Sequence, residues 1–94
     1  MTESHRLRVP DRVAETIRSL HPTLKQQIRA ALQVLIQRPA AGKALKNELA
    51  GLRSHRVGRS RIVYRLAGER TIDIVAIGPR RTIYEETYRL LRRP

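Results

Sequence analysis

The apolar stripe between Pro22 and Pro39 constrains the fold of this 94-residue chain more than any other sequence feature. Its members recur at the i, i+4, i+7 and i+8 spacing of one helix face. They are Leu24, Ile28, Ala31, Leu32, Leu35 and Ile36. Because proline cannot continue a helix from within, Pro22 and Pro39 bound the segment. The stripe therefore predicts a helix between them, one face of which another element must cover.

A shorter helix is expected immediately before this one. Asp11 is a good N-cap residue, and Val13, Ile17 and Leu20 follow at helical spacing. His21-Pro22 then interrupts the pattern, so the two helices should form a helical hairpin. Their shared apolar face needs a sheet or a further helix to bury it.

The other segments alternate polar and apolar residues or concentrate β-branched ones, which is typical of strands. Strands are predicted at His5–Val9, Ser54–Val57, Ser60–Leu66 and Thr71–Ile77, with turns at Gly58-Arg59 and Ala67–Arg70 and a strand end at Gly78-Pro79. Arg38–Arg53 is expected to be a basic connecting loop, in which Ala44–Leu49 could form one helical turn. Thr82–Arg92 is expected to be a terminal helix with Ile83, Thr87, Leu90 and Leu91 on one side.

The order of elements predicts an α+β fold. It is β-α-α-β-β-β-α, with the helical hairpin packed on one face of a mainly antiparallel sheet. A chain of 94 residues is expected to build one core, so residues 1–94 should form a single domain. Cysteine is absent, which excludes disulfides and thiolate metal sites, so the fold depends on apolar packing.

Positive charge dominates the polar residues. Lysine and arginine total 20 against 8 aspartates and glutamates, which gives a formal net charge of +12. Most of this excess is arginine, whose forked guanidinium group suits phosphate. Nucleic acid, and RNA above all, is therefore the expected anionic partner. An acidic membrane surface is the weaker alternative, because no helix combines a basic face with exposed Trp or Phe.

Sequence features of several other protein classes are absent. Met1–Arg6 lacks the apolar stretch of a signal peptide, and no apolar run reaches the ~20 residues that span a bilayer. The three histidines, His5, His21 and His55, have no metal-binding spacing. No glycine-rich loop precedes a helix in the arrangement that binds nucleotides. We therefore expect a cytoplasmic protein with no membrane partner, no metal and no cofactor.

Counting outward from the Gly58-Arg59 turn places two arginines opposite each other. With a two-residue loop, Val57 faces Ser60 and Arg56 faces Arg61. Like charges directly opposite each other destabilise a sheet, so this pair suggests that an anion binds between them. The alternative is a charged face that simply points into solvent. The other face of the hairpin, with His55, Val57, Ile62 and Tyr64, is expected to line the core under the helices.

The end of the next strand brings further cations to this region. Arg80 and Arg81 follow Gly78-Pro79, and Tyr84 follows about one helical turn later. A phenol beside guanidinium groups suits contact with a phosphate or a base, although a core tyrosine is an equal alternative. The basic surface extends over further residues that are expected to bind RNA. Together these are Lys43, Lys46, Arg53, Arg59 and Arg81.

The hairpin segment also carries a family resemblance. Leu52–Tyr64 reads Leu-Arg-Ser-His-Arg-Val-Gly-Arg-Ser-Arg-Ile-Val-Tyr and resembles, without a gap, the R-V-G-D-Y-R-I-I-Y signature of RelE/ParE toxins. Upstream, Arg38-Pro39 and Leu49–Leu52 resemble the proline and the L-x-G-L motif that follow two helices in that family. Downstream, Ile77–Tyr84 resembles its I-G-H-R-x-x-V-Y ending. The resemblance spans nearly the whole chain and agrees with the predicted order of elements.

The resemblance implies a microbial toxin of a type II toxin–antitoxin pair, of the RelE kind that cleaves messenger RNA in the ribosomal decoding site. By position, Arg56, Arg61, Arg80 and Tyr84 match its catalytic residues. The RNA 2′-hydroxyl would attack the adjacent phosphorus while Arg61 stabilises the phosphate charge and Arg80 the leaving 5′-oxygen. Arg56 would hold the substrate, and Tyr84 would orient the attacking nucleotide or stack on a base. The implied partners are messenger RNA on the ribosome and a cognate acidic antitoxin.

The sequence departs from the family pattern in three places. Arg53-Ser54 and Arg59-Ser60 replace a Tyr-Arg and an Asp-Tyr pair, and Pro79 replaces a histidine. No side chain is then an obvious general base, since His55 is expected to face away from the site and Lys46 is only a second possibility. Two alternatives stay open. One is a ParE-like toxin that inhibits DNA gyrase and cleaves nothing, and the other is an inactive RNA-binding relative.

Overall fold

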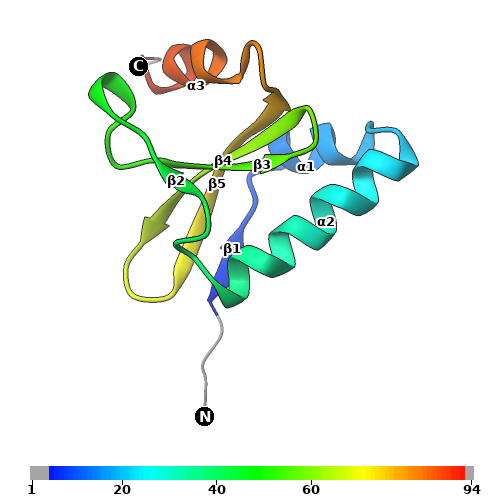
Figure 1. Cartoon of the computed structure of the whole chain (residues 1–94), viewed down its shortest axis with the longest axis horizontal. Helices are drawn as coiled ribbons and strands as arrows, with labels where there is room; N and C mark the ends of the chain where they lie inside the picture. Colours follow the sequence, from blue (N-terminus) through cyan, green and yellow to red (C-terminus); the bar gives the residue numbers. More distant parts are fainter. Residues whose placement is uncertain (1–4, 93–94) are drawn as a thin grey trace.

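The computed structural model describes residues 5–92. The two ends of the expected 1–94 domain therefore lie outside the described residues. They include Met1–Ser4, part of the Met1–Arg6 segment in which no signal-peptide stretch was expected. Figure 1 shows the described elements coloured along the chain. In chain order they are β1 (Arg6–Arg8), α1 (Asp11–Arg18), α2 (Pro22–Gln37), β2 (Lys43–Ala44), the 3-10 helix η1 (Asn47–Leu49), β3 (Arg53–Val57), β4 (Ser60–Ala67), β5 (Thr71–Pro79) and α3 (Ile83–Arg92).

The strands form one five-stranded sheet in the order β1-β5-β4-β3-β2. Only the β1–β5 pair is parallel; the other pairs are antiparallel. Helices α1 and α2 lie on one side of the sheet, and α3 packs against β4 and β5 on the other side (Figure 1). The predicted α+β fold with a mainly antiparallel sheet is confirmed. No helix among residues 5–92 is long and apolar enough to cross a membrane.

Each face of the sheet carries its own apolar cluster. On the face covered by α1 and α2, Ile28 and Leu35 of α2 pack with Ile62 and Tyr64 of β4, and all four are fully buried. This confirms the predicted α2 stripe and the predicted core face of the hairpin. On the other face, α3 contributes Ile83 to a smaller cluster formed by Leu52, Val63, Val75, Ala76 and Ile83.

A β-bulge in β5 supplies the extra residue in this smaller cluster. Val63 pairs with Ala76 and Tyr64 with Ile74, so Val75 has no partner residue on β4. The carbonyl of Val75 accepts a hydrogen bond of 2.8 Å from Arg12 Nη1 of α1. The bulge therefore adds an apolar side chain beneath α3, and an arginine satisfies its carbonyl group.

The segment after α2 is more ordered than predicted. The buried Tyr64 hydroxyl donates to the Pro39 carbonyl at 2.6 Å and accepts from the Gly42 N–H at 2.9 Å. A Cβ at Gly42 would lie 2.7 Å from that hydroxyl, so only glycine fits this close approach. The prediction of an irregular loop over 38–53 is wrong for β2, which is too short to show alternation in the sequence. The predicted helical turn is present as η1.

Two local predictions need correction. The N-cap of α1 is Pro10, whose extended backbone accepts from two N–H groups, and Asp11 is the first helical residue. The predicted strand end at Gly78-Pro79 is confirmed, because β5 ends at Pro79, and both residues still pair with β4. Leu91, which was expected on the buried side of α3, is 47% exposed.

Candidate functional site

Arg61 is the centre of the site. It lies on β4, on the same sheet face as α3, and its Nη1 donates to Ser54 Oγ at 3.1 Å. The Tyr84 hydroxyl of α3 donates to the same Ser54 oxygen at 3.1 Å. The guanidinium carbon of Arg61 lies 6.0 Å from the centre of the Tyr84 ring, within range of a cation–π contact. Two neutral groups therefore hold Arg61 in place and leave its positive charge intact.

Arg56 lies directly opposite Arg61 in the hairpin. The register pairs Arg56 with Arg61 and Val57 with Ser60, as predicted from the two-residue turn. Arg56 is exposed, and its Nε donates to the Gly58 carbonyl at 3.2 Å. Among residues 5–92, no carboxylate lies within ion-pair distance of either arginine. Two uncompensated cations on neighbouring strands form a favourable place for an anion.

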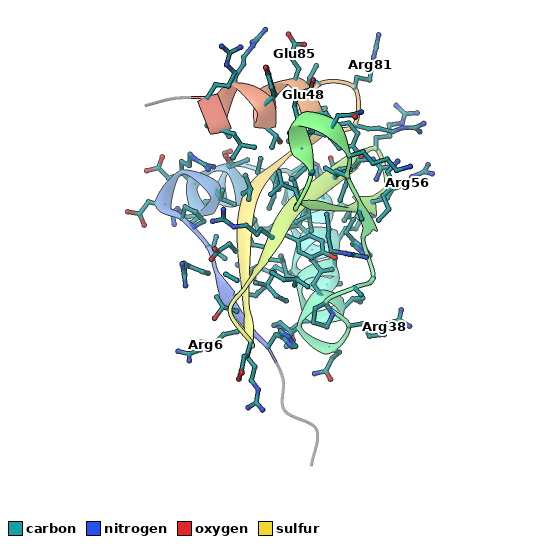
Figure 2. All side chains as sticks on the ribbon, turned by 90° about the vertical axis from the view of Figure 1, so that its left-hand side faces the viewer. Arg6, Arg38, Glu48, Arg56, Arg81 and Glu85 are labelled. Atoms are coloured by element: carbon teal, nitrogen blue, oxygen red, sulfur yellow. The ribbon has the colours of Figure 1, made fainter. Side chains whose placement is uncertain are left out.

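Arg80 follows the last residue of β5, at the same end of the sheet. Its backbone N–H donates to the Arg59 carbonyl at 2.8 Å, which extends the β4–β5 pairing by one step. The side chains of Arg59, Arg80 and Arg81 are exposed. In Figure 2, Arg56 and Arg81 project from the upper right of the molecule, whereas Arg6 lies at the opposite, lower end. The predicted arginines thus gather where the hairpin turn meets the start of α3.

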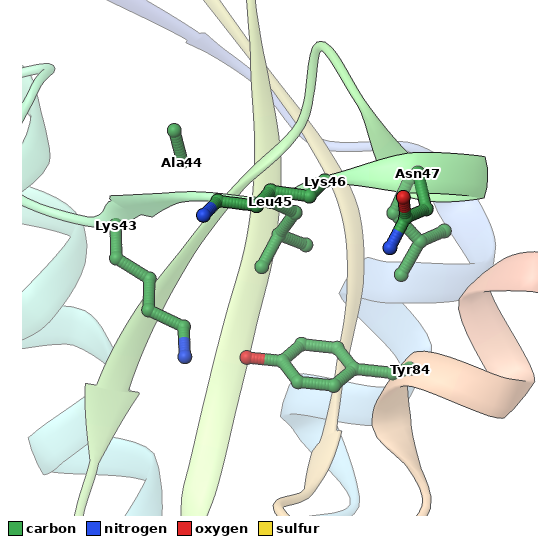
Figure 3. A pocket seen from close by; sticks show the side chains of 7 residues that line it. Lys43, Ala44, Leu45, Lys46, Asn47 and Tyr84 are labelled. Carbon is green, nitrogen blue, oxygen red and sulfur yellow. The ribbon is translucent and has the colours of Figure 1, made fainter.

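Tyr84 also forms one wall of a pocket of about 500 Å³ beside β2 and η1. Lys43, Lys46 and Asn47 contribute its polar groups, while Leu45 and Leu49 give it an apolar floor. Figure 3 shows the Tyr84 ring beneath Leu45, with its hydroxyl end directed toward Lys43. An aromatic wall with two ammonium groups nearby suits a nucleobase and its phosphate.

Arg53 differs from the other predicted RNA-binding residues. Its Nε donates to the Gly42 carbonyl at 3.0 Å and its Nη2 to the Ala40 carbonyl at 3.2 Å. In the β3–β4 register it pairs with the buried Tyr64, on the sheet face opposite Arg61. The structure therefore places this guanidinium against the loop rather than among the arginines around Arg61.

Ser54 is the site residue that the sequence did not reveal. It is 2% exposed and accepts hydrogen bonds from both Arg61 and Tyr84. In the sequence it stood out only as a departure from the family pattern. The hairpin register could have identified it, because Ser54 pairs with Val63, two residues from Arg61 on the same face.

His55 faces away from Arg61, as the register predicted. It pairs with Ile62, on the face covered by α1 and α2. Burial lowers the pKa of His55 below its ordinary value, and the positive charges of Arg38 and Arg61 lower it further. His55 is therefore predominantly neutral near pH 7, but it does not point at the site. No group of acidic, histidine or cysteine residues within the described chain could hold a metal ion.

Comparison with protein families gives a match over most of the chain. A family model described as "ParE toxin of type II toxin-antitoxin system, parDE" matches residues 6–84. The chain belongs to this toxin family. The toxin lies within the RelE/ParE superfamily, as its motifs indicated. A comparison with curated protein sequences gives no match.

Solved structures support the same assignment of the toxin. A RelBE toxin–antitoxin complex from Mycobacterium tuberculosis is 29% identical with a TM-score of 0.73, over 82% of this chain and 99% of that one. A mutant of the E. coli toxin RelE in the free state is 19% identical with a TM-score of 0.72, over 92% of both chains. An archaeal RelE–RelB complex from Pyrococcus horikoshii is 22% identical with a TM-score of 0.66, over 81% and 94%. The last two structures, at 19% and 22% identity, show only that the toxin shares their fold.

Proposed function

We propose that the toxin is a ribosome-dependent endoribonuclease that cleaves messenger RNA. The observation that carries this proposal is the Arg61 guanidinium, which Ser54 and Tyr84 hold opposite Arg56 without a neutralising carboxylate. A phosphodiester placed between the two arginines would supply the missing negative charge. Arginine is suited to this contact because its donors match two phosphate oxygens at once.

The chemistry that this arrangement favours is transfer of the phosphoryl group to the ribose. The 2′-oxygen attacks the adjacent phosphorus, the bond to the 5′-oxygen breaks, and the products are a 2′,3′-cyclic phosphate and a free 5′-hydroxyl. Arg61 would stabilise the charge that builds on the non-bridging oxygens, and Arg80 would stabilise the leaving oxygen. Arg56 would hold the phosphate, and Tyr84 would orient the attacking nucleotide or stack on a base.

Proton transfer is the step for which the site is least equipped. The 2′-hydroxyl must lose a proton and the 5′-oxygen must gain one, yet arginine does not exchange protons near neutral pH. Lys46, which lines the pocket together with Lys43 and Tyr84, is a titratable cation beside a nucleotide bound there. An enzyme with a weak base depends on a substrate already held in line, which the ribosome would provide. Cleavage of naked RNA should therefore be slow.

The remaining cations would bind the RNA chain. Lys43 and Lys46 would contact the nucleotide in the Tyr84 pocket, and Arg59 and Arg81 would contact neighbouring phosphates. Arg53 would act indirectly, by fixing the loop that carries Lys43. The related structure from Mycobacterium tuberculosis is a toxin–antitoxin complex, and this toxin's net charge of +12 favours a cognate acidic antitoxin as partner. We also propose that residues 1–94 act as one domain and that the protein is cytoplasmic.

A second function is a ParE-like toxin that inhibits DNA gyrase without cleaving RNA. Two observations favour it: the matching family is described as ParE, and His55, the histidine of the hairpin, faces away from Arg61. An inactive RNA-binding relative would share the same basic surface.

The deciding experiment expresses the toxin and maps cleavage of messages on translating ribosomes. Arg61→Ala and Arg80→Ala should each abolish growth arrest and message cleavage. Arg29→Ala is the matched control, because Arg29 is an exposed arginine of α2 on the other side of the sheet. Arrest with intact messages and stalled DNA replication would overturn the nuclease proposal and support the gyrase alternative. An absence of both would leave the RNA-binding relative.

A further inference from the structure

A second basic pocket lies on the same sheet face as Arg61, at the opposite end of β4. It measures about 270 Å³ and lies where β1, α1, β4 and β5 meet the C-terminal part of α3. We call it the Asp73 pocket. Its lining residues are Arg8, Pro10, Arg12, Arg65, Asp73, Ile74, Val75 and Leu91. None of them contributes to the proposed catalytic group.

Asp73 stands at the centre of this pocket between two arginines. The sheet register places it beside Arg8 on β1 and Arg65 on β4. It forms ion pairs of 3.2 Å with Arg8 Nε and with Arg65 Nη2. Only the Arg65 contact is directed as a hydrogen bond, and it reaches Oδ2. The arginine side chains are 67% and 55% exposed, so both have donors left for a ligand.

The second oxygen of Asp73 lacks a hydrogen bond. Oδ1 is buried, and within residues 5–92 no donor is directed at it, although Arg8 Nε lies at 3.2 Å. The ion pair depends on distance alone, whereas a hydrogen bond also requires the N–H to point at the oxygen. A buried carboxylate oxygen without a donor is costly. The Arg8 side chain beside Oδ1 is 67% exposed, so it can move aside when a ligand binds, and a ligand N–H group at this point would remove that cost.

We propose that the Asp73 pocket binds an acidic peptide segment of a partner protein. A carboxylate of the peptide would bind the free donors of Arg8 and Arg65, and a peptide N–H would donate to Asp73 Oδ1. This proposal rests on the proposed function only in identifying the partner protein as the cognate antitoxin.

The chemistry of the pocket favours a peptide over RNA. Asp73 repels a carboxylate and a phosphate alike, but a peptide carries N–H groups beside its carboxylate that can donate to Oδ1, whereas a phosphodiester group has no donor. The apolar lining is aliphatic, with Ile74, Val75 and the 47% exposed Leu91, and contains no aromatic ring on which a base could stack. The Arg61 end differs, with a tyrosine and, among residues 5–92, no carboxylate within ion-pair distance of Arg56 or Arg61. The two pockets therefore suit two different classes of ligand.

The test measures binding of a fluorescent helical peptide of Glu, Leu and Gln to the intact toxin. We expect Arg65→Gln to weaken binding about tenfold, the effect of losing one charge-assisted hydrogen bond. Arg29→Gln is the matched control, since it removes the same charge from the exposed surface of α2, and it should leave the affinity unchanged. Thermal unfolding of each variant shows whether the fold is retained. Equal affinities of these two folded variants, or no binding by the intact toxin, would overturn the proposal.

A second variant tests the exclusion of RNA. In Asp73→Asn the repulsion of phosphate is removed while the side-chain volume is kept, so we expect a polyuridine oligonucleotide to gain an additional binding site. If no such site appears, Asp73 does not select against RNA. Competition between polyuridine and the peptide on the unmodified toxin would also overturn the proposal. The absence of message cleavage, in contrast, would overturn the proposed function and leave these binding results unaffected.

Discussion

Arg61 and Arg65 lie on the same face of β4, yet their surroundings are opposite in character. Arg61 contacts the Ser54 hydroxyl and the Tyr84 ring, both neutral, whereas Arg65 pairs with the buried carboxylate of Asp73. Val63 lies between them beneath Ile83 of α3. The comparison teaches that a count of arginines does not locate an anion site. The groups that fix each guanidinium decide whether its charge remains available.

The two ends should also differ in how they affect stability. Arg56 and Arg61 are opposite each other, so their repulsion opposes folding until an anion binds. Asp73 lies between Arg8 and Arg65, so its charge favours folding without any ligand. Part of the toxin's stability is therefore given up at the Arg61 end to keep positive charge available. At the Asp73 end opposite charges attract, and the unfavourable contribution there is the Oδ1 that lacks a hydrogen bond.

The largest expected effect follows from Arg61→Lys. Lysine keeps the charge but cannot donate to Ser54 and to two phosphate oxygens in one fixed geometry. We expect message cleavage on translating ribosomes to fall about a hundredfold, the loss typical of removing one donor to the transition state. Arg29→Lys, at an exposed position of α2, should cleave at the unmodified rate. If Arg61→Lys also kept full activity, charge alone would suffice and the contrast between the two ends would disappear.

A smaller effect is expected from Asp73→Asn, measured by urea unfolding. The change removes the negative charge between Arg8 and Arg65 and should lower the free energy of unfolding by about 1–2 kcal/mol. Glu85→Gln is the matched control, because Glu85 pairs with Arg89 on the exposed side of α3 and should cost less than about 0.5 kcal/mol. Equal costs would mean that Asp73 contributes no more than a surface charge.

The sequence predicted the elements that depend on local patterns. The α2 stripe and the β3–β4 register both follow from spacing, and both are confirmed. The register in turn placed Arg56 and Arg61 on one face. What it did not predict depends on contacts between distant segments. Ordering of β2 requires the Tyr64 hydroxyl, 22 residues from Gly42 along the chain, and no local pattern encodes that contact.

The Asp73 pocket shows the same limit of sequence reasoning. Asp73 stands in an apolar strand, and no local sequence pattern links it with Arg8 or Arg65. Its role becomes visible only when the parallel pairing of β1 with β5 brings Arg8 alongside. In the sequence Ser54 is likewise only a departure from the family pattern, and its role becomes visible when α3 places the Tyr84 hydroxyl against it. In each case a contact between segments that are distant along the chain supplies the partner residue.

Ser54→Ala should reduce cleavage without removing any charge. The variant leaves Arg61 and Tyr84 without their shared acceptor, so both side chains gain freedom. We expect kcat to fall about fivefold, which corresponds to about 1 kcal/mol of positioning, while KM changes little. Single-turnover cleavage on stalled ribosomes measures this. A change confined to KM would mean that Ser54 affects binding and not the alignment of Arg61.

The smallest effect concerns pH and the face behind Arg61. Burial, Arg38 and Arg61 lower the pKa of His55 below its ordinary value of 6.5, so the unfolded chain binds this proton more readily than the folded one. The stability that neutral His55 contributes is therefore present above pH 6.5 and is lost as the pH falls through the folded-state pKa. The urea midpoint should therefore decrease between about pH 7 and pH 5, and His55→Gln should reduce the decrease. Because the Arg61 charge contributes to the lowered pKa, Arg61→Gln should also weaken this pH dependence. If Arg61→Gln left this pH dependence unchanged, the charge of Arg61 would not affect His55 on the opposite face of the sheet. Its electrostatic effect would then be confined to the face that carries Tyr84.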